Sequence, residues 1–234
     1  MNKKLWVISL GGSRIIPNEV DFKFLEDFKK LIESHPNQKF VIVTGGGITA
    51  RKYILALRKL GKSTKKQSMA GIQITRFHAR FMAKFFGRKA NEDIPLNKKK
   101  VKNLLLKNQV VFCGALKYQD HNTSDGTAAE IASYLNCPFI NLTNIRGLYN
   151  ENPKKDKKAK FISKITWKKF NLIASKIKYK AGQHFVLDQG ASKIIMDNKV
   201  PTYIVGSLKD IDNILKGKKI RGTKIFGWWF RNWN

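Results

Sequence analysis

Three consecutive glycines, Gly45 to Gly47, follow an apolar run that ends at Thr44 and precede a helical pattern. Glycine costs backbone entropy, and a simple turn needs only one, so three are expected where another group must approach the backbone closely. The start of a helix offers free N–H groups and the positive end of the helix dipole, which favour an anion, often a phosphate. Arg51, one turn into the helix, adds charge and a fork of donors. The segment predicts a phosphate site, and a tight turn without a ligand is the alternative.

Two other segments of the chain have similar chemistry. Gly11 and Gly12 follow the apolar run that ends at Leu10, and Thr123 and Ser124 stand just ahead of another helical pattern. Either hydroxyl can cap its helix or face an anion. Parallel sheets bind ligands beyond the carboxyl ends of their strands, where these segments would meet. Together the three segments predict a polyphosphate site, although the chain contains neither a G-x-x-x-x-G-K-[ST] loop nor a G-x-G-x-x-G fingerprint.

The elements that must position these segments alternate along the chain. Short apolar runs rich in β-branched residues predict buried parallel strands at Leu5–Leu10, Phe40–Thr44, Val110–Leu116, Pro138–Thr143 and Pro201–Val205. Helical patterns lie between them at 21–34, Thr49–Leu60, 71–86, Val101–Lys107, 124–135, 166–177, 190–198 and 208–215. The alternation predicts an α/β fold, a three-layer αβα sandwich with a central, mainly parallel sheet. We expect one domain over residues 1–225, followed by an aromatic C-terminal tail, 226–234, that packs on its own body or on a neighbouring subunit.

The chain is strongly basic, with 46 Lys and Arg against 16 Asp and Glu and a net charge of +30. Such a charge attracts polyanions whatever the fold. The lysines are scattered through every segment, and no basic helix is interleaved with aromatic residues in the manner of a nucleic-acid-binding motif. This favours a solvated lysine surface that meets nucleic acid only non-specifically. A selected RNA- or DNA-binding role is the alternative.

Several features of the sequence concern the location of the protein. No apolar run approaches the roughly 18 residues of a membrane span, and Leu5–Leu10 is shorter than a signal-peptide core. The two cysteines, Cys113 and Cys137, lie far apart, and neither they nor the four histidines have the spacing of metal ligands. We expect a reduced, cytoplasmic protein without membrane contact and without a metal site built from these side chains.

The order of the motifs resembles the amino acid kinase family and, within it, the archaeal-type uridylate (UMP) kinases. The resemblance spans about residues 4 to 225. It is carried by "SLGGS" (9–13), "VTGGGITARKYI" (43–54), "GIQITR" (71–76), "TSDGTAAEIA" (123–132), "TNIRGLYNENPKKD" (143–156), "LDQGASKII" (187–195) and "GTKI" (222–225).

The resemblance implies transfer of the γ-phosphoryl group of ATP, with Mg²⁺, to UMP to give UDP, a chemistry that needs mainly positioning and charge neutralisation. It also implies a homo-oligomer, a hexamer built from dimers. Residues that match the ATP-binding positions are Gly12, Ser13, Gly47, Arg51, Thr143, Asn144, Tyr149 and Asn152. Residues that match the UMP-binding positions are Gly46, Ser68, Gly114, Asn122, Thr123 and Ser124. The implied catalytic residues are Arg51, Asp188 and Lys193, with Asp188 organising the site and a cation meeting the transferring phosphoryl group.

The chain also departs from the pattern of these kinases. Ser68 stands where they usually carry an aspartate that binds the ribose of UMP, and Asn152 replaces a common acidic residue. Arg146 interrupts the segment after the fourth strand. An alternative therefore stays open: a degenerate member that acts as a nucleotide-binding sensor or as a basic nucleic-acid-binding protein.

Two further residues of the motifs have open roles. Asp125 is expected to be a first-turn residue favoured by the helix dipole more than a catalyst. Arg76 is expected either to bind a phosphate or to brace its helix.

Overall fold

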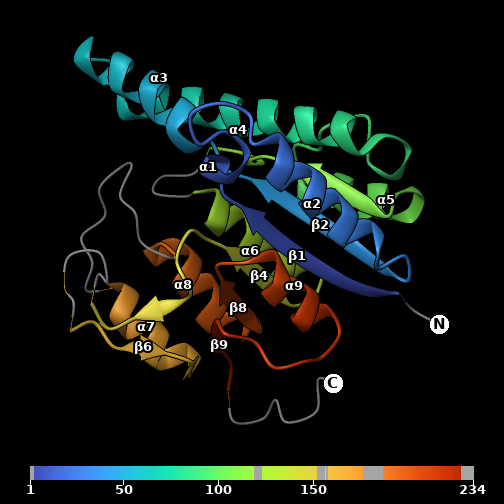
Figure 1. The fold of residues 1–234 in the computed structure, drawn as a ribbon. Helices are drawn as coiled ribbons and strands as arrows, with labels where there is room; N and C mark the ends of the chain where they lie inside the picture. The colour runs from blue at the N-terminus through green and yellow to red at the C-terminus, as the bar shows by residue number, and fades with distance from the viewer. Residues whose placement is uncertain (1–2, 119–122, 152–155, 157, 176–186, 228–234) are drawn as a thin grey trace.

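The computed structural model describes residues 3–118, 123–151, 156, 158–175 and 187–227. A seven-stranded sheet runs through the centre of the molecule in the order β3-β2-β1-β4-β8-β9-β7 (Figure 1). These strands are β1 (Lys4–Leu10), β2 (Gln38–Thr44), β3 (Val110–Cys113), β4 (Phe139–Leu142), β7 (Lys164–Ile165), β8 (Thr202–Val205) and β9 (Thr223–Ile225). All neighbouring strands are parallel except β8 and β9. A separate antiparallel pair joins β5 (Leu148–Tyr149) to β6 (Phe161–Ile162).

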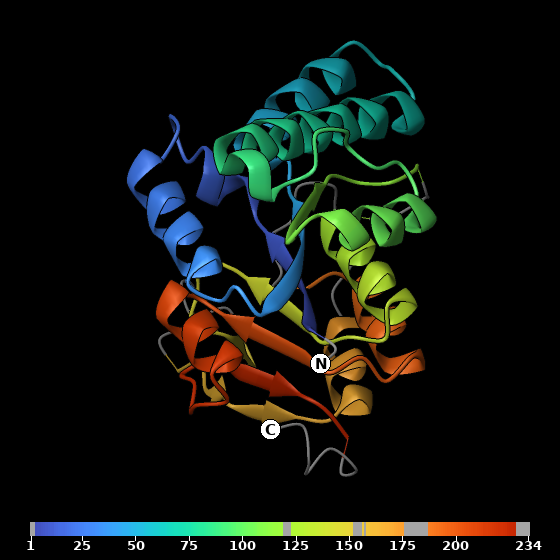
Figure 2. The same ribbon diagram turned by 90° about the vertical axis from the view of Figure 1, so that its right-hand side faces the viewer.

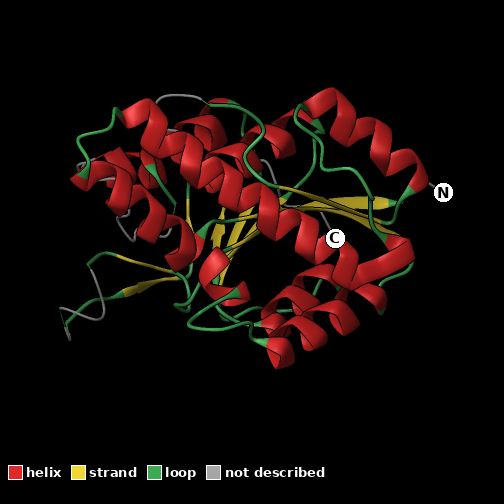
Figure 3. Ribbon diagram, turned by 90° about the horizontal axis from the view of Figure 1, so that it is seen from above, coloured by secondary structure: helices red, strands yellow, loops and turns green. Residues whose placement is uncertain are grey.

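Helices cover both faces of the sheet, as Figures 2 and 3 show. One core cluster joins the sheet to α5 (Lys98–Lys107), α6 (Ser124–Tyr134), α7 (Trp167–Ser175) and α8 (Gln189–Asp197). The other cluster joins it to α1 (Gly12–Ile15), α2 (Phe22–Glu33), α4 (Thr64–Phe86) and α9 (Leu208–Leu215). The helix α3 (Gly47–Lys59) packs beside α4, which is followed by the 3-10 turn Gly87–Lys89. The three-layer α/β prediction is confirmed.

The side chains of β1 alternate between the two faces of the sheet, and both faces are buried, so the strand reads as a continuous apolar run. Val7 belongs to the first cluster, whereas Trp6, Ile8 and Leu10 belong to the second. Because both faces of the strand are covered, side chains of both parities are buried. Among the described residues, no helix combines the length and apolar character needed to cross a membrane.

Several element boundaries differ from the predicted ones, and two of these differences have a clear local cause. The predicted strand Val110–Leu116 ends at Cys113, because the next segment bonds to α4 rather than to a strand. There the amide of Ala115 donates to Thr75 Oγ1 at 2.9 Å. The predicted helix 71–86 begins already at Thr64, where the Ser63 side chain caps it. The short strands β5, β6, β7 and β9 and the one-turn helix α1 were not predicted.

Candidate functional site

The two glycine turns lie in direct contact at the carboxyl ends of β1 and β2. A Cβ on Gly12 would lie 2.4 Å from the carbonyl oxygen of Gly45 and 2.5 Å from the amide nitrogen of Gly47. Gly47 has φ +58°, and its own Cβ would lie 2.5 Å from the carbonyl carbon of Gly12. Glycine is therefore required at both positions for the close approach of the turns to each other. This contact explains the glycines by itself, and binding of phosphate by the turns stays a prediction.

The start of α3 presents donors next to this contact. Gly46 is the N-cap and has no side chain to cap the helix, so the first-turn amides have no partner within α3. Arg51 follows in the next turn, half-buried, and among the described residues its guanidinium has no hydrogen bond or ion pair. Free amides, the positive end of the helix dipole and an unpaired cation together suit an anion.

A buried histidine holds the glycine turn from behind. His78 of α4 is fully buried, and its Nδ1 lies 2.8 Å from the carbonyl oxygen of Gly45. Burial lowers the pKa of His78, so the neutral ring donates this hydrogen bond. Nε2 has no partner among the described residues. His78 has no signal in the sequence, because a lone histidine in a helix belongs to no motif.

Two carboxylates meet at the same edge of the sheet. Ser9 Oγ of β1 donates to Asp125 Oδ1 at 2.6 Å. Thr123 Oγ1 donates to Asp188 Oδ2, and Asp188 Oδ1 caps α8 by accepting from the amide of Ala191 at 2.8 Å. Burial raises the pKa of Asp125 to about 7; the Ser9 bond opposes this shift, and the charge of Asp188 adds to it. Asp125 lies in the first turn of α6, as predicted. Its carboxylate accepts a hydrogen bond from Ser9 of β1 and is close enough to Asp188 to be affected by its charge.

The loop after β3 is tied to α4. A Cβ on Gly114 would lie 2.6 Å from the backbone nitrogen of Arg76. The Arg76 guanidinium donates to the carbonyl oxygens of Ala115 at 3.0 Å and Leu116 at 2.7 Å. Arg76 therefore braces the loop that contains Gly114, and a contact of its guanidinium with a phosphate stays a prediction.

The loops after β4 and β8 are joined by Arg14, which sequence reasoning missed. Its guanidinium donates to the carbonyl oxygens of Thr143 at 2.7 Å and Gly206 at 2.8 Å. Asn144 is exposed next to this point. Tyr149 is half-buried and packs edge-on against Phe161, with ring centroids 5.5 Å apart. These loops meet α1 and so lie beside the glycine turns.

Some predicted site residues are not joined to this group. Lys193 pairs with Asp197 at 2.8 Å on the exposed face of α8, and its side chain is 70% exposed. Ser68 is half-buried in the second turn of α4 and has no hydrogen bond among the described residues. Asn122 and Asn152 lie outside the described residues. The roles assigned to these four residues stay predictions.

The carboxylate pair fits the donor set of a magnesium ion. Mg²⁺ is usually held by one or two carboxylates together with substrate phosphates and water. Asp125 and Asp188 supply two carboxylates, and the charge of Asp188 raises the pKa of Asp125. In the part of the chain that the structure describes, no group of three or more potential metal ligands occurs, so phosphate oxygens would have to complete the coordination.

Comparison with known proteins places this arrangement in a family. The profile of the amino acid kinase family matches residues 4–206. The chain belongs to the amino acid kinase family. This amino acid kinase is 35% identical over 223 residues to the uridylate kinase of Archaeoglobus fulgidus, covering 94% of this chain and 98% of the relative. It is 31% identical over 217 residues to the uridylate kinase of Thermococcus kodakarensis, covering 91% and 95%.

Solved structures agree with this assignment. The crystal structure of the Archaeoglobus fulgidus uridylate kinase matches this amino acid kinase with a TM-score of 0.82 and 33% identity, over 94% of this chain and 99% of that one. The UMP kinase of Ureaplasma parvum matches with a TM-score of 0.79 over 97% and 100% of the two chains. At 18% identity the second match shows the shared fold alone.

Proposed function

We propose that this protein is a UMP kinase, which transfers the γ-phosphoryl group of ATP to UMP to give UDP and ADP. The observation that carries the proposal is the contact between two glycine turns beside the Asp125–Asp188 pair at the carboxyl edge of the sheet. Phosphoryl transfer needs two phosphate groups held in line and their charge neutralised. Two adjoining backbone turns with nearby carboxylates meet that need, and the uridylate kinases among the relatives match nearly the full chain.

The ATP phosphates would lie against Gly12, Ser13, Gly47 and Arg51. The adenosine part would lie near the loops after β4, with the contacts assigned to Thr143, Asn144, Tyr149 and Asn152. The unpaired state of the Arg51 guanidinium supports its role, since a charge-assisted bond to a phosphate oxygen is stronger than one to a neutral acceptor.

UMP would lie against Gly46, Ser68, Gly114, Asn122, Thr123 and Ser124. The start of α6 supports this assignment, because Ser124 Oγ would lie 3.3 Å from a Cβ on Gly45 of the glycine turn. The loop at Gly114 is held in place by Arg76. Thr123 also contacts Asp188, which would link the acceptor site to the carboxylates.

Asp125 and Asp188 would hold Mg²⁺. The ion supplies positive charge to the phosphate oxygens during transfer. The protein's part is to fix the two carboxylates: Ser9 orients Asp125, while Thr123 and the first turn of α8 orient Asp188. Arg51, and Lys193 if its side chain leaves Asp197, would meet charge on the transferring group.

We propose that the protein works as a cytoplasmic homo-oligomer, a hexamer built from dimers. Exposed apolar side chains on two neighbouring helices support self-association. They are Tyr53 and Leu55 of α3, Leu60 just after α3, and Phe77 of α4. Nucleic acid would bind only non-specifically, through the +30 charge. We also propose that residues 1–225 act as one domain and that the tail, 226–234, is an addition to it.

The test is a set of initial-rate measurements with ATP, Mg²⁺ and each of UMP, CMP, AMP and GMP, with the nucleotide products separated by chromatography. UMP should be the best acceptor, and UDP and ADP should form in equal amounts. Asp188→Asn should remove most of this activity while keeping the fold. Measurable ATP binding without turnover of any acceptor would instead indicate a nucleotide-binding protein.

A further inference from the structure

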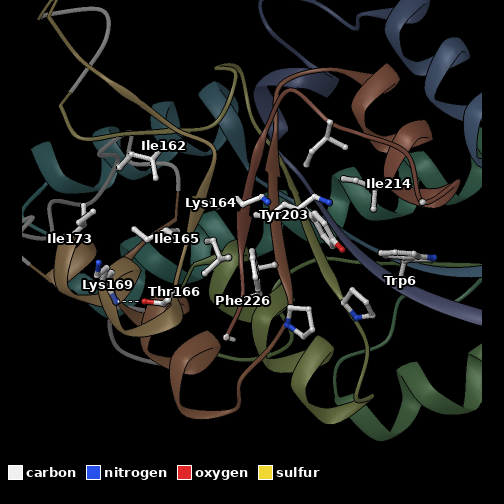
Figure 4. Close-up of a pocket in the computed structure, with 18 of the residues that line it drawn as sticks. Trp6, Ile162, Lys164, Ile165, Thr166, Lys169, Ile173, Tyr203, Ile214 and Phe226 are labelled. Atoms are coloured by element: carbon white, nitrogen blue, oxygen red, sulfur yellow. Dashed lines mark hydrogen bonds between the residues drawn. The ribbon is translucent and has the colours of Figure 1, made fainter. Parts of the chain in front are cut away.

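The amino ends of the central strands carry a groove of about 990 Å³. Lys4 opens β1, and Pro138 and Pro201 immediately precede β4 and β8, so the groove lies at the opposite end of these strands from the glycine turns. In Figure 4, Ile165 and Ile173 lie to one side of Lys164, and Tyr203 and Trp6 lie to the other. Nothing in the proposed kinase reaction uses this surface.

The groove concentrates positive charge without a counter-charge. Five lysines line it, and none of the described lining residues is acidic. None of these lysines pairs with a carboxylate among the described residues. Lys164 and Lys224 are direct partners on parallel β7 and β9, and burial, followed by the charge of Lys164, lowers the pKa of Lys224. Two lysines at paired positions of neighbouring strands, with the charge of one acting on the other, favour an anion between them.

The rest of the lining is apolar and offers few specific hydrogen bonds. It contains isoleucines from six elements or loops, and the described part includes no Asn or Gln. Of its hydroxyl groups, Thr202 Oγ1 donates to the carbonyl oxygen of Val200 at 3.0 Å, and Thr166 Oγ1 accepts from the amide of Lys169 at 3.3 Å. Recognition of a polar edge such as that of a nucleobase depends on several convergent polar groups, whereas an alkyl chain needs only apolar surface.

We propose that this groove binds a soluble, single-chain organic anion, a carboxylate or phosphate head on an alkyl chain. The head lies between Lys164 and Lys224, and the chain lies over the isoleucines and Tyr203. The inference rests on lysines without carboxylate partners that lie next to an apolar surface with few hydrogen-bonding groups. It is independent of the kinase reaction. Removing alkyl carbon from water then sets the affinity, so each added CH₂ should tighten binding roughly two- to fourfold.

The test is calorimetric titration of the full chain with dodecanoate, kept below its micellar concentration. We expect one dodecanoate per chain, weaker binding of decanoate and octanoate in that order, and no heat from acetate, inorganic phosphate or dodecyltrimethylammonium. Equal binding of the cationic amphiphile, or affinity that does not depend on chain length, would overturn the proposal.

A charge-matched pair of variants separates the groove from the general basic surface. Lys164→Gln/Lys224→Gln should weaken dodecanoate binding at least about tenfold, because a bond to a charged group is lost. Lys99→Gln/Lys102→Gln removes the same charge from the exposed face of α5 and should leave the affinity unchanged. Both variants should keep the activity with UMP. Equal losses of affinity in the two variants would show that the +30 charge alone attracts the anion and would overturn the proposal.

Two other occupants of the groove are distinguished by the same assay. Phe226 and Gly227 line the groove, so a chain that ends at Gly227 should bind dodecanoate as the full chain does. Binding at least about tenfold tighter in the shortened chain would identify the aromatic tail as the natural occupant and overturn the proposal. A second copy of the chain is the other possible occupant, and Leu172 at the groove is 53% exposed. If Leu172→Asp lowers the mass of the oligomer in sedimentation equilibrium, the groove is an interface between copies and the proposal is overturned.

Discussion

The glycine-turn site at one end of the central sheet and the groove at its other end contain different charged groups. At the carboxyl ends of the strands, Asp125 and Asp188 lie beside two packed glycine turns, with Arg51 as an unpaired cation nearby. At the amino ends, five lysines line a groove without a carboxylate among its described residues. The first end suits a polyphosphate that brings a divalent cation with it, and the second suits a lone anion. The two sites thus suit different anions, because carboxylates lie beside the glycine turns and are absent from the described lining of the groove.

The two ends also differ in how closely their parts fit. At the glycine turns, backbone meets backbone, and a single methyl group would not fit. The groove is lined by side chains, among them flexible lysines that can move aside. The carboxyl end should therefore be sensitive to small changes, and the amino end tolerant of them.

The largest effect expected is that of Gly47→Ala, which would break the carboxyl end. An alanine at φ +58° is strained, and its Cβ would lie 2.5 Å from the carbonyl carbon of Gly12. The turns must separate, and a displacement of roughly 1 Å at a reacting centre costs about 10²-fold in rate. We expect kcat/KM for UMP to fall by at least that factor, measured by initial rates.

Gly61→Ala is the matched control for this change. Gly61 has φ +65°, close to that of Gly47, but a Cβ there would meet nothing within 4 Å. Both alanines carry the same backbone strain of about 1–2 kcal/mol, so only the contact between the turns differs. An equal loss of activity in Gly61→Ala would mean that strain, and not the fit of the turns, controls the rate.

The next largest effect is expected for Arg51→Ala. Removing a cation that clamps a transferring phosphate should lower kcat/KM about 10²-fold. Arg58, on the same helix, bonds only to Gln67 at 3.4 Å among the described residues, so Arg58→Ala should keep full activity. Unchanged kinetics in a folded Arg51→Ala variant would remove this guanidinium from the site.

The carboxyl end could largely be predicted from sequence, and the reason is physical. Glycine runs after apolar strands and an N-cap hydroxyl are local patterns, so the sequence predicts that Gly12, Gly47 and Thr123 lie together at this edge of the sheet. The buried parallel strands were found for the same reason, since both faces of each strand are apolar. His78 and Arg14 were missed, because each acts on a carbonyl far away in sequence.

The amino end could not be predicted, because no local pattern marks it. Its lysines come from the start of β1, the edge strand β7, its neighbour β9, α7 and the segment after α9. Strands as short as Lys164–Ile165 have too few residues to show an alternating pattern. In a chain with 46 basic residues, five lysines stand out only when the fold brings them together without a carboxylate.

A smaller effect is expected at Ser68, where these kinases usually carry an aspartate. A carboxylate can accept from both ribose hydroxyls, and such charged bonds are worth about 1.5–3 kcal/mol. Ser68→Asp should therefore lower the KM for UMP by roughly tenfold and increase the preference for UMP over deoxy-UMP. Ser68→Asn, which has a similar shape without the charge, should change neither value much. If the parent already prefers UMP over deoxy-UMP by a hundredfold, another residue recognises the ribose.

The smallest effect concerns pH and His78, which ties the glycine turn to α4. Burial lowers the pKa of this ring, so the folded state binds fewer protons than the unfolded state below pH 6.5 or so. The free energy of unfolding then falls as the pH drops through that value, by at most about 1.4 kcal/mol per pH unit for one proton.

His78→Asn separates this proton from the hydrogen bond. The amide nitrogen of Asn lies near the place of Nδ1 and can still donate to the carbonyl oxygen of Gly45, but it does not titrate. Urea unfolding at pH 7.5 and pH 5.5 should therefore show a smaller loss of stability in the variant than in the parent. Activity at pH 7.5 should fall only slightly, because the glycine turn keeps its anchor. An equal loss of stability in both proteins would mean that the pKa of His78 is the same in the folded and unfolded states and that other groups cause the pH dependence.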